Sequence, residues 1–347
     1  MKKALVICLA LLMVCGVVFS AFGCAADAPA NVEPDTSSGE SKQGTSVLQG
    51  DPSEVYYMIT FMSELDFWKD CFRGMEDAAT QLGVKVEYTG CEDFDINQEV
   101  TVLEQVISTN PKGIAITCVN DEALADPINK ALEQGIQVIT FDNPSYSSNA
   151  DTVIRSDSLT AGQAAGEYMA GLCGGKGTVA VMYVAGTTNH EQRAQGFREV
   201  IAANYPDMEV VDALITGDQD NGAQVMSSLI QANPDIVGAF TCTADPTLGI
   251  IQAVAEAGIE DQVHIIGFDT DTTLLDAIKA GTCDATVAQG SYNEGYWAMH
   301  MLYHAVHELP NPVNNWKENG MNPLPVNIDT GVNIVNAENV DSFYMAE

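Results

Sequence analysis

The stretch His264-Ile265-Ile266-Gly267-Phe268-Asp269 decides the fold, because it is an apolar run that closes on a Phe-Asp pair and leads into a helical segment over 270–280. An earlier unit has the same plan, since an apolar run over 136–140 leads to Phe141-Asp142. Ligands of open α/β sheets bind beyond the carboxyl ends of the strands. We therefore expect two similar lobes, with Asp142 and Asp269 directed into one shared cleft.

Apolar runs and helical segments alternate with short turns from Glu54 onward, a pattern typical of an α/β fold. The runs are apolar throughout, which indicates parallel sheets covered by helices on both faces. A connector over 309–325 is rich in proline and asparagine, and 326–335 has the pattern of two short strands broken at Thr330-Gly331. Because these strands lie so far along the chain, we expect it to cross between the lobes more than once and to form a hinge.

The composition describes an acidic globular protein. Its 347 residues allow two domains of ordinary size, and 46% hydrophobic residues supply ample core. The net charge of −34 excludes nucleic acid as a partner, since phosphates need a basic surface, and also disfavours adsorption to anionic lipid. Nine cysteines include no CxxC pair. The body cysteines could form disulfides, as in many exported proteins, or could be buried free thiols, and the sequence leaves both alternatives open.

The N-terminus has the pattern of an export signal. Two lysines precede an apolar run over 4–22, which Gly23-Cys24 closes. The ending Ala21-Phe22-Gly23-Cys24 resembles a bacterial lipobox, with Ala21 where leucine is commonest, and this implies lipidation of Cys24. An uncleaved membrane anchor is the alternative, because the run is long enough to span a bilayer. We expect an exported protein, lipid-anchored to the outer face of the cytoplasmic membrane or periplasmic.

The predicted organisation follows from these segments. After the signal, the composition over 25–50 has almost nothing to bury and predicts a disordered tether. The predicted parts are a signal peptide over 1–23, the lipidated cysteine and tether over 24–53, a first lobe over 54–155 plus about 290–322, and a second lobe over 156–289 plus about 323–347.

Motifs for catalysis or metal binding have little support. The chain has no GxSxG, no Walker lysine motif and no Gly-rich dinucleotide loop after the first strand. His300, His304 and His307 share one helix face, but Met301 stands where HExxH requires a glutamate, so we interpret them as a partly solvated face. We expect the protein to bind no metal and no cofactor and to have no enzymatic activity. Paired acids across a cleft keep a secreted glycosidase as a remaining alternative.

Five features recur in a fixed order over about 54–335. Together they resemble the ribose/galactose-type periplasmic sugar-binding proteins, the substrate receptors of ABC importers. The resemblance implies a type I periplasmic binding protein fold: two flavodoxin-like lobes with parallel sheets, a three-segment hinge, and a monosaccharide or polyol closed in the cleft. It also implies a monomer that docks on permease subunits. The features are Phe67-Trp68 at the first helix, Asp142, Arg193 within Gln192-Arg193-Ala194-Gln195-Gly196-Phe197, Gly267-Phe268-Asp269, and Ala285-Thr286-Val287-Ala288-Gln289.

The residue types suit a sugar. Phe67 and Trp68 offer aromatic surfaces for an apolar C–H face, although packing in the core is the alternative. Asp142 and Asp269 can each accept two hydroxyl donors through charge-assisted hydrogen bonds, and helix capping is the alternative for each. Arg193 can donate in a fork, or it can form a salt bridge that braces the hinge.

Four further residues are weaker candidates for ligand contact. The Gln289 amide at a strand end can donate and accept at once, as hydroxyls require. Asn143 stands where many relatives have an arginine, so a contact there would be neutral. Thr117 and Thr243 occupy strand ends where relatives often carry asparagine. The hypothesis is thus a solute-binding protein for an ABC permease, with a ligand-sensing input for a chemoreceptor or sensor kinase as the alternative.

Overall fold

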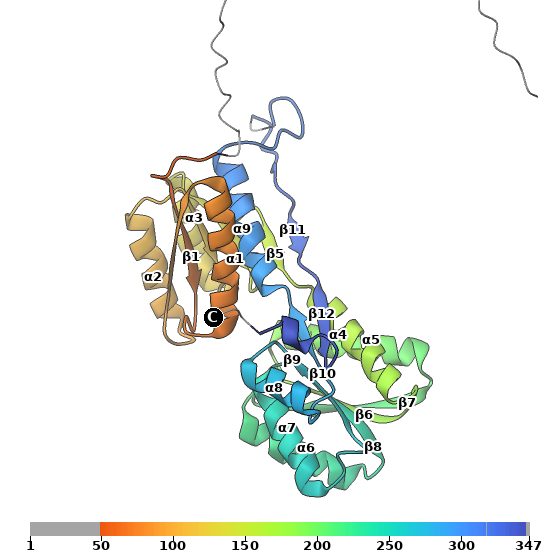
Figure 1. Ribbon diagram of the computed structural model, residues 1–347. Helices are drawn as coiled ribbons and strands as arrows, with labels where there is room; N and C mark the ends of the chain where they lie inside the picture. The colour runs from red at the N-terminus through yellow and green to blue at the C-terminus, as the bar shows by residue number, and fades with distance from the viewer. Residues whose placement is uncertain (1–48, 317, 345–347) are drawn as a thin grey trace, which may run out of the picture. The chain divides into compact units, whose positions relative to one another are not determined.

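The computed structural model describes residues 49–316 and 318–344, which fall within one compact unit, Ser46–Glu347 (Figure 1). The expected signal peptide, Cys24 and most of the tether lie outside the described residues. Across the described ranges, no helix is long and apolar enough to cross a membrane.

The first lobe is built on a six-stranded sheet in the order β11-β5-β4-β3-β1-β2, with every pair of neighbouring strands parallel. Four helices flank this sheet (Figure 1). The elements are β1 Val55–Thr60, α1 Asp66–Leu82, β2 Lys85–Gly90, α2 Ile96–Ser108, β3 Gly113–Ile116, α3 Asp121–Glu133, β4 Gln137–Phe141, β5 Val153–Arg155, α9 Ser291–Val306 and β11 Asn327–Asp329.

The apolar strands of this sheet serve two cores. Successive side chains of a strand point to opposite faces, and in β1 Met58 packs with α1 and α9 while Ile59 packs with α2 and α3. Both side chains are fully buried. The strands are apolar throughout because helices cover both faces of the parallel sheet, as the sequence predicts.

The second lobe repeats the plan with the sheet order β12-β10-β9-β8-β6-β7, in which only the β10–β12 pair is antiparallel. The predicted α/β fold with two mostly parallel sheets is confirmed. Its elements are α4 Ser158–Leu172, β6 Lys176–Tyr183, α5 Thr188–Asn204, β7 Asp207–Leu214, α6 Gln219–Ala232, β8 Ile236–Thr241, α7 Asp245–Ala257, β9 His264–Phe268, α8 Thr272–Ala280, β10 Ala285–Gln289, β12 Val332–Asn336 and the 3-10 helix η1 Val340–Ser342.

Local sequence sets many of the helix ends. An aspartate or asparagine side chain accepts a backbone N–H at the start of α2, α3, α4 and α6, where free N–H groups need partners. A glycine with positive φ ends α1, α7 and α8, a conformation that costs glycine little. These signals therefore fix where these helices begin or end between neighbouring strands.

The chain passes between the two sheets three times, after β5, after β10 and after β11. The last passage differs from the boundary near 322 that the sequence indicates, because β11 pairs with β5 in the first sheet. The edge of β5 offers backbone hydrogen-bonding groups, and Val153 N–H donates to the Val326 carbonyl oxygen at 3.0 Å. The connector rich in proline and asparagine therefore precedes a first-lobe strand, and the passage occurs at Thr330-Gly331, the predicted break between two short strands.

Ser156 joins all three passages. Its Oγ accepts the Gly290 N–H at 2.9 Å and lies 2.9 Å from both the Thr330 Oγ1 and the Gly331 carbonyl oxygen. Its backbone N–H donates to Oε1 of Glu294 at 3.1 Å. Since Ser156 is only 4% exposed, these bonds are shielded from water, and a single side chain holds the hinge segments in register.

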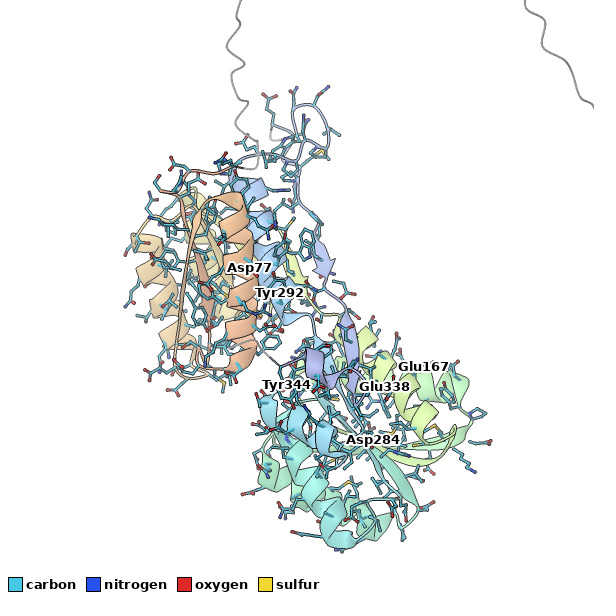
Figure 2. All side chains as sticks on the ribbon, viewed as in Figure 1. Asp77, Glu167, Asp284, Tyr292, Glu338 and Tyr344 are labelled. Atoms are coloured by element: carbon cyan, nitrogen blue, oxygen red, sulfur yellow. The ribbon has the colours of Figure 1, made fainter. Side chains whose placement is uncertain are left out.

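Helices α1 and α9 pack with their backbones close together. A Cβ placed on Gly295 of α9 would meet the carbonyl oxygen of Cys71 in α1 far inside van der Waals contact, and a Cβ on Gly74 would meet the Tyr292 carbonyl oxygen in the same way. Side chains also connect the two helices, since the Tyr292 hydroxyl donates to Oδ2 of Asp77 at 2.9 Å (Figure 2).

We predict that Gly295→Ala lowers the free energy of unfolding by about 1–3 kcal/mol, because the Cys71 backbone must shift to admit the methyl group. Gly171→Ala, near the end of α4, is the matched control, because its Cβ meets nothing within 4 Å, and it should leave stability equal or slightly higher. Urea denaturation measures both variants. Equal stability of Gly295→Ala and the wild type would contradict this account of the helix contact.

Candidate functional site

A cavity of about 390 Å³ opens beside the hinge, at the carboxyl ends of the strands. Its size falls in the range of small-molecule sites. Phe67, Asp269 and Gln289, which the sequence indicates as ligand contacts, line this cavity. Tyr292 from α9 and Tyr344 after η1, both labelled in Figure 2, line it as well. The first-lobe lining comes from helices α1 and α9, whereas the ends of β9 and β10 contribute from the second lobe; Asp142 and Arg193 are not among the lining residues.

A chain of hydrogen bonds fixes the second-lobe wall. Arg193 from α5 is 3% exposed, and its Nη1 donates to the Cys242 carbonyl oxygen at 2.9 Å. Its Nη2 donates to Oε1 of Gln289 at 3.2 Å, and Nε2 of Gln289 donates to Oδ1 of Asp269 at 2.8 Å. The guanidinium lies 3.7 Å from the centroid of the Phe268 ring. These contacts hold three predicted site residues in one fixed arrangement.

Asp142 and Asp269 have the same unusual backbone. Each follows the last residue of a parallel strand, and each has positive φ, 51° and 67°. Their N–H groups donate to neighbouring strands, at 2.8 Å to the Ile154 carbonyl oxygen and 2.9 Å to the Val287 carbonyl oxygen. A non-glycine residue in this conformation costs about 1–3 kcal/mol and persists only where the surroundings enforce it. The matched strain places two carboxylates at equivalent strand ends.

The two carboxyl groups share the field of Arg193. Burial raises the pKa of Asp142 to about 6, the Arg193 and Arg155 charges oppose this rise, and the Asp269 charge adds to it. Burial also raises the pKa of Asp269, against the lowering effects of Arg193 and of the Gln289 hydrogen bond. The charges act over a short range, so these effects support the predicted meeting of both aspartates at one site.

Several buried polar atoms around these groups have no hydrogen-bond partner among the described residues. An unpaired buried donor or acceptor costs about 1–3 kcal/mol, and native proteins contain few. Burial, with the Arg193 charge, lowers the pKa of one of them, His190, to about 3, so its ring is neutral. Each of these atoms keeps free hydrogen-bonding capacity. The atoms are Trp68 Nε1, Arg155 Nε, His190 Nδ1, Arg193 Nε and Glu294 Oε2.

The aromatic pair divides between cavity and core. Phe67 is half-buried and lines the cavity. Trp68 is 3% exposed and makes edge-to-face contacts with Phe61, Phe67 and Phe141 at centroid distances of 5.3, 4.8 and 5.9 Å. Because other rings enclose its ring, the structure favours the alternative of a core residue for Trp68, and ligand contact by its face stays a prediction.

The threonine candidates have hydrogen-bond partners within the protein. Thr117 is fully buried, and its Oγ1 accepts the Asn143 N–H at 3.3 Å, so it supports the loop after β4, and ligand contact by Thr117 stays a prediction. The Asn143 carbonyl oxygen accepts the Cys118 N–H at 2.8 Å, and Asn143 itself is half-buried beside Asp142. Thr243 is half-buried, and its carbonyl oxygen accepts the Thr241 hydroxyl at 2.7 Å. Ligand contact by Asn143 and by Thr243 stays a prediction.

The described residues hold no group of three His, Cys, Asp or Glu side chains that could bind a metal ion. On the predicted histidine face, His307 instead meets Glu54, with Nε2 3.0 Å from Oε2. All six body cysteines are free, and burial raises the pKa of each thiol for which a shift is resolved.

Comparison with known proteins gives one family. Residues 55–308 match the family described as periplasmic binding protein domain. AraP, an arabinose-binding protein from Geobacillus stearothermophilus, is 41% identical, with a TM-score of 0.80 over 85% of this chain and 100% of AraP. A sugar-binding protein of a sugar ABC transporter from Bacillus halodurans is 40% identical, with a TM-score of 0.80 over 84% of this chain and 100% of that one.

A structure of a XylFII–LytSN complex is also similar. It is 26% identical, with a TM-score of 0.66 over 83% of this chain and 99% of that one.

We predict that Asp142→Asn removes a pH-dependent loss of stability. The folded pKa, about 6, lies above the ordinary value of 3.8, so the folded state binds the Asp142 proton more tightly than the unfolded state. Stability from this group therefore falls as pH rises from about 4 to about 6 and stays low above that window. Thermal midpoints of the wild type and Asp142→Asn should diverge in favour of the variant across this range.

The matched control for this prediction is Asp261→Asn, at an exposed position between α7 and β9. Its midpoint should follow that of the wild type at every pH. A constant difference between the wild type and Asp142→Asn from pH 4 to pH 7 would show that the folded pKa of Asp142 is not raised.

Proposed function

Since this chain belongs to the periplasmic binding protein family, we propose that it binds a monosaccharide or similar polyol outside the cytoplasm and delivers it to the permease of an ABC importer. The unpaired polar atoms around Asp142 and Asp269 carry this proposal. They include N–H donors on Arg155 and Arg193 and the Oε2 atom of Glu294, which a ring of hydroxyls can satisfy.

The roles of the residues follow from their chemistry. The carboxylates of Asp142 and Asp269 accept hydroxyl protons, and Gln289 presents an amide beside Asp269. Phe67 covers an apolar C–H face of the sugar ring from the first lobe. Because contacts come from both lobes, bound sugar favours the closed arrangement, and a permease would recognise that arrangement. These are binding roles, so we infer a receptor and not an enzyme.

We propose an aldopentose as the first ligand class to test. Arabinose is the sugar named for AraP, at 41% identity over 85% of this chain. Arg193, Gln289 and Asp269 are held by hydrogen bonds to one another, and such preorganisation reduces the entropy lost on binding. The protein acts as a monomer in this proposal, anchored through a lipid on Cys24 or free in the periplasm.

A second candidate function is sensing. The similarity to the XylFII–LytSN complex favours it, because that structure joins a protein of this fold to a second protein. In this alternative, the sugar-bound form acts on a chemoreceptor or sensor kinase instead of a permease. Deleting the protein from its host separates the two. Lost sugar uptake supports import, whereas lost sugar-induced expression with intact uptake supports sensing.

We predict that Asp269→Ala weakens sugar binding by at least about a hundredfold, since the Gln289 amide and the sugar hydroxyls lose a charged acceptor. Calorimetry and thermal-shift assays should use L- and D-arabinose, D-ribose, D-xylose, D-galactose and inositol. At least one sugar should raise the wild-type midpoint, because a ligand that prefers the folded state stabilises it. Asp261→Ala is the exposed control and should bind as the wild type does.

Two results would count against this function. No midpoint shift with any of these sugars would contradict sugar binding itself. An unchanged affinity in Asp269→Ala, with sugar bound by the wild type, would instead remove Asp269 from the site.

We predict that Cys24→Ser prevents lipid attachment. The thiol is the acceptor for the lipid, and serine at this position offers only a hydroxyl. Expression in a bacterial host, followed by membrane fractionation and intact mass measurement, should find the wild type in the membrane fraction with an added lipid mass. A soluble wild-type protein that lacks the added mass would refute the lipid anchor.

A further inference from the structure

Arg155 lies beside Asp142 at the edge of the first sheet, although the sequence gives it no role in binding. The parallel register of β4 and β5 pairs Phe141 with Ile154, so the next residues, Asp142 and Arg155, are neighbours at the carboxyl edge. The positive charge of Arg155 lowers the pKa of Asp142, which supports the same proximity. Arg155 is also the last residue before Ser156, the residue that joins the hinge segments.

The guanidinium of Arg155 has no protein partner among the described residues. It is half-buried, its Nε has no partner, and among the described residues it makes no ion pair and no side-chain hydrogen bond. Arg193 has instead committed two nitrogens to Cys242 and Gln289. A guanidinium has five N–H donors in a planar fork, and burying them unpaired is unfavourable. Arg155 thus has donors available for a guest.

Glu294, in the first turn of α9, provides a second atom without a hydrogen-bond partner. It is fully buried, and its Oε1 accepts from the Ser156 N–H at 3.1 Å and the Ser156 Oγ at 3.4 Å. Its Oε2 is buried and has no partner. Burial and the Asp142 charge raise the pKa of Glu294 well above its ordinary value, which favours the protonated carboxyl and lets Oε2 act as a donor.

We propose that Arg155 and Glu294 form, with Asp142, a subsite next to the hinge segments that recognises one hydroxyl group of a neutral sugar. A hydroxyl has one proton and two lone pairs. Asp142 accepts the proton, and Arg155 and Glu294 donate to the oxygen, so the hydroxyl uses its full hydrogen-bonding capacity. The subsite rests on the proposed sugar binding and adds the residues that select among sugars.

The same charges disfavour an anionic guest. The carboxylate of a sugar acid would lie beside Asp142 and Asp269, whose charges repel it, while Arg193 is already shared between them. A neutral hydroxyl avoids this repulsion and still satisfies the free donors. The subsite therefore takes neutral polyols, and it discriminates against analogues that lack the hydroxyl near the hinge.

The test is calorimetric titration with L-arabinose or D-ribose, whichever the wild type binds, and with the monodeoxy analogues of that sugar. The wild type should bind one monodeoxy analogue about 10- to 100-fold more weakly than the parent sugar, because its absent hydroxyl leaves buried donors unpaired. Arg155→Met should bind the parent about tenfold or more weakly and no longer discriminate against that analogue. A purely structural role for Arg155 would weaken all analogues equally.

The Glu294 variants separate hydrogen bonding from packing. Glu294→Gln keeps the shape, an acceptor for Ser156 and an N–H donor, so it should bind within about threefold of the wild type. Glu294→Leu should lose both affinity and discrimination. Arg198→Met is the matched control for Arg155, because Arg198 is ion-paired with Asp212 on the second lobe at 2.6 Å, and it should bind and discriminate as the wild type does.

The outcomes distinguish the two proposals. If the wild type binds sugar but Arg155→Met and Glu294→Leu keep its affinity and its ranking of the analogues, the subsite is wrong and the proposed function stands. If the wild type binds none of the sugars, the function itself is wrong, and the subsite with it. Thermal midpoints without sugar report folding. If Arg155→Met does not fold, Arg155→Lys replaces it in the test. Lysine keeps the charge but lacks the forked guanidinium donors, so this variant must discriminate less between the parent sugar and its monodeoxy analogue.

Discussion

The buried charge of Arg193 is the interaction on which the site depends. Asp142 and Asp269 both lie where burial favours their neutral forms, and Arg193 opposes that effect at both. The guanidinium itself is held by the Cys242 carbonyl oxygen, by Gln289 and over the ring of Phe268. A neutral side chain at position 193 would leave two carboxyl groups that accept hydroxyl protons poorly. The arginine thus couples the second-lobe wall to a carboxyl group on the first.

The hinge relates this charge network to the fold. Ser156 binds the other two passages of the chain through one hydroxyl, and its N–H donates to the buried Glu294. Arg155 and Ser156 are consecutive, so the residue that faces Asp142 is covalently joined to the residue that holds the hinge. Ligand contacts beside Asp142 would therefore lie next to the segments that connect the two lobes.

The sequence predicts the fold well because strand and helix signals are local, and its prediction of Asp142, Asp269 and Gln289 as ligand contacts rests on the convergence of parallel strand ends. It does less well where three-dimensional packing decides. Trp68 follows a strand as Phe67 does, yet neighbouring rings enclose it. Arg155 and Glu294 escape a sequence-based search because an arginine at a strand end and an acid in a first helical turn are ordinary surface patterns. Only the register of β4 with β5, and the burial of Glu294 in α9, place them beside Asp142 and Ser156.

The central claim is that carboxylates from two separate lobes hold one polyhydroxy guest. A crystal structure of the protein grown with arabinose or ribose tests it most directly. The account predicts a single sugar with hydroxyl oxygens about 2.5–3.0 Å from carboxylate oxygens of both Asp142 and Asp269. A sugar that touches the carboxyl group of one lobe alone, or that occupies a different surface of the molecule, would contradict it.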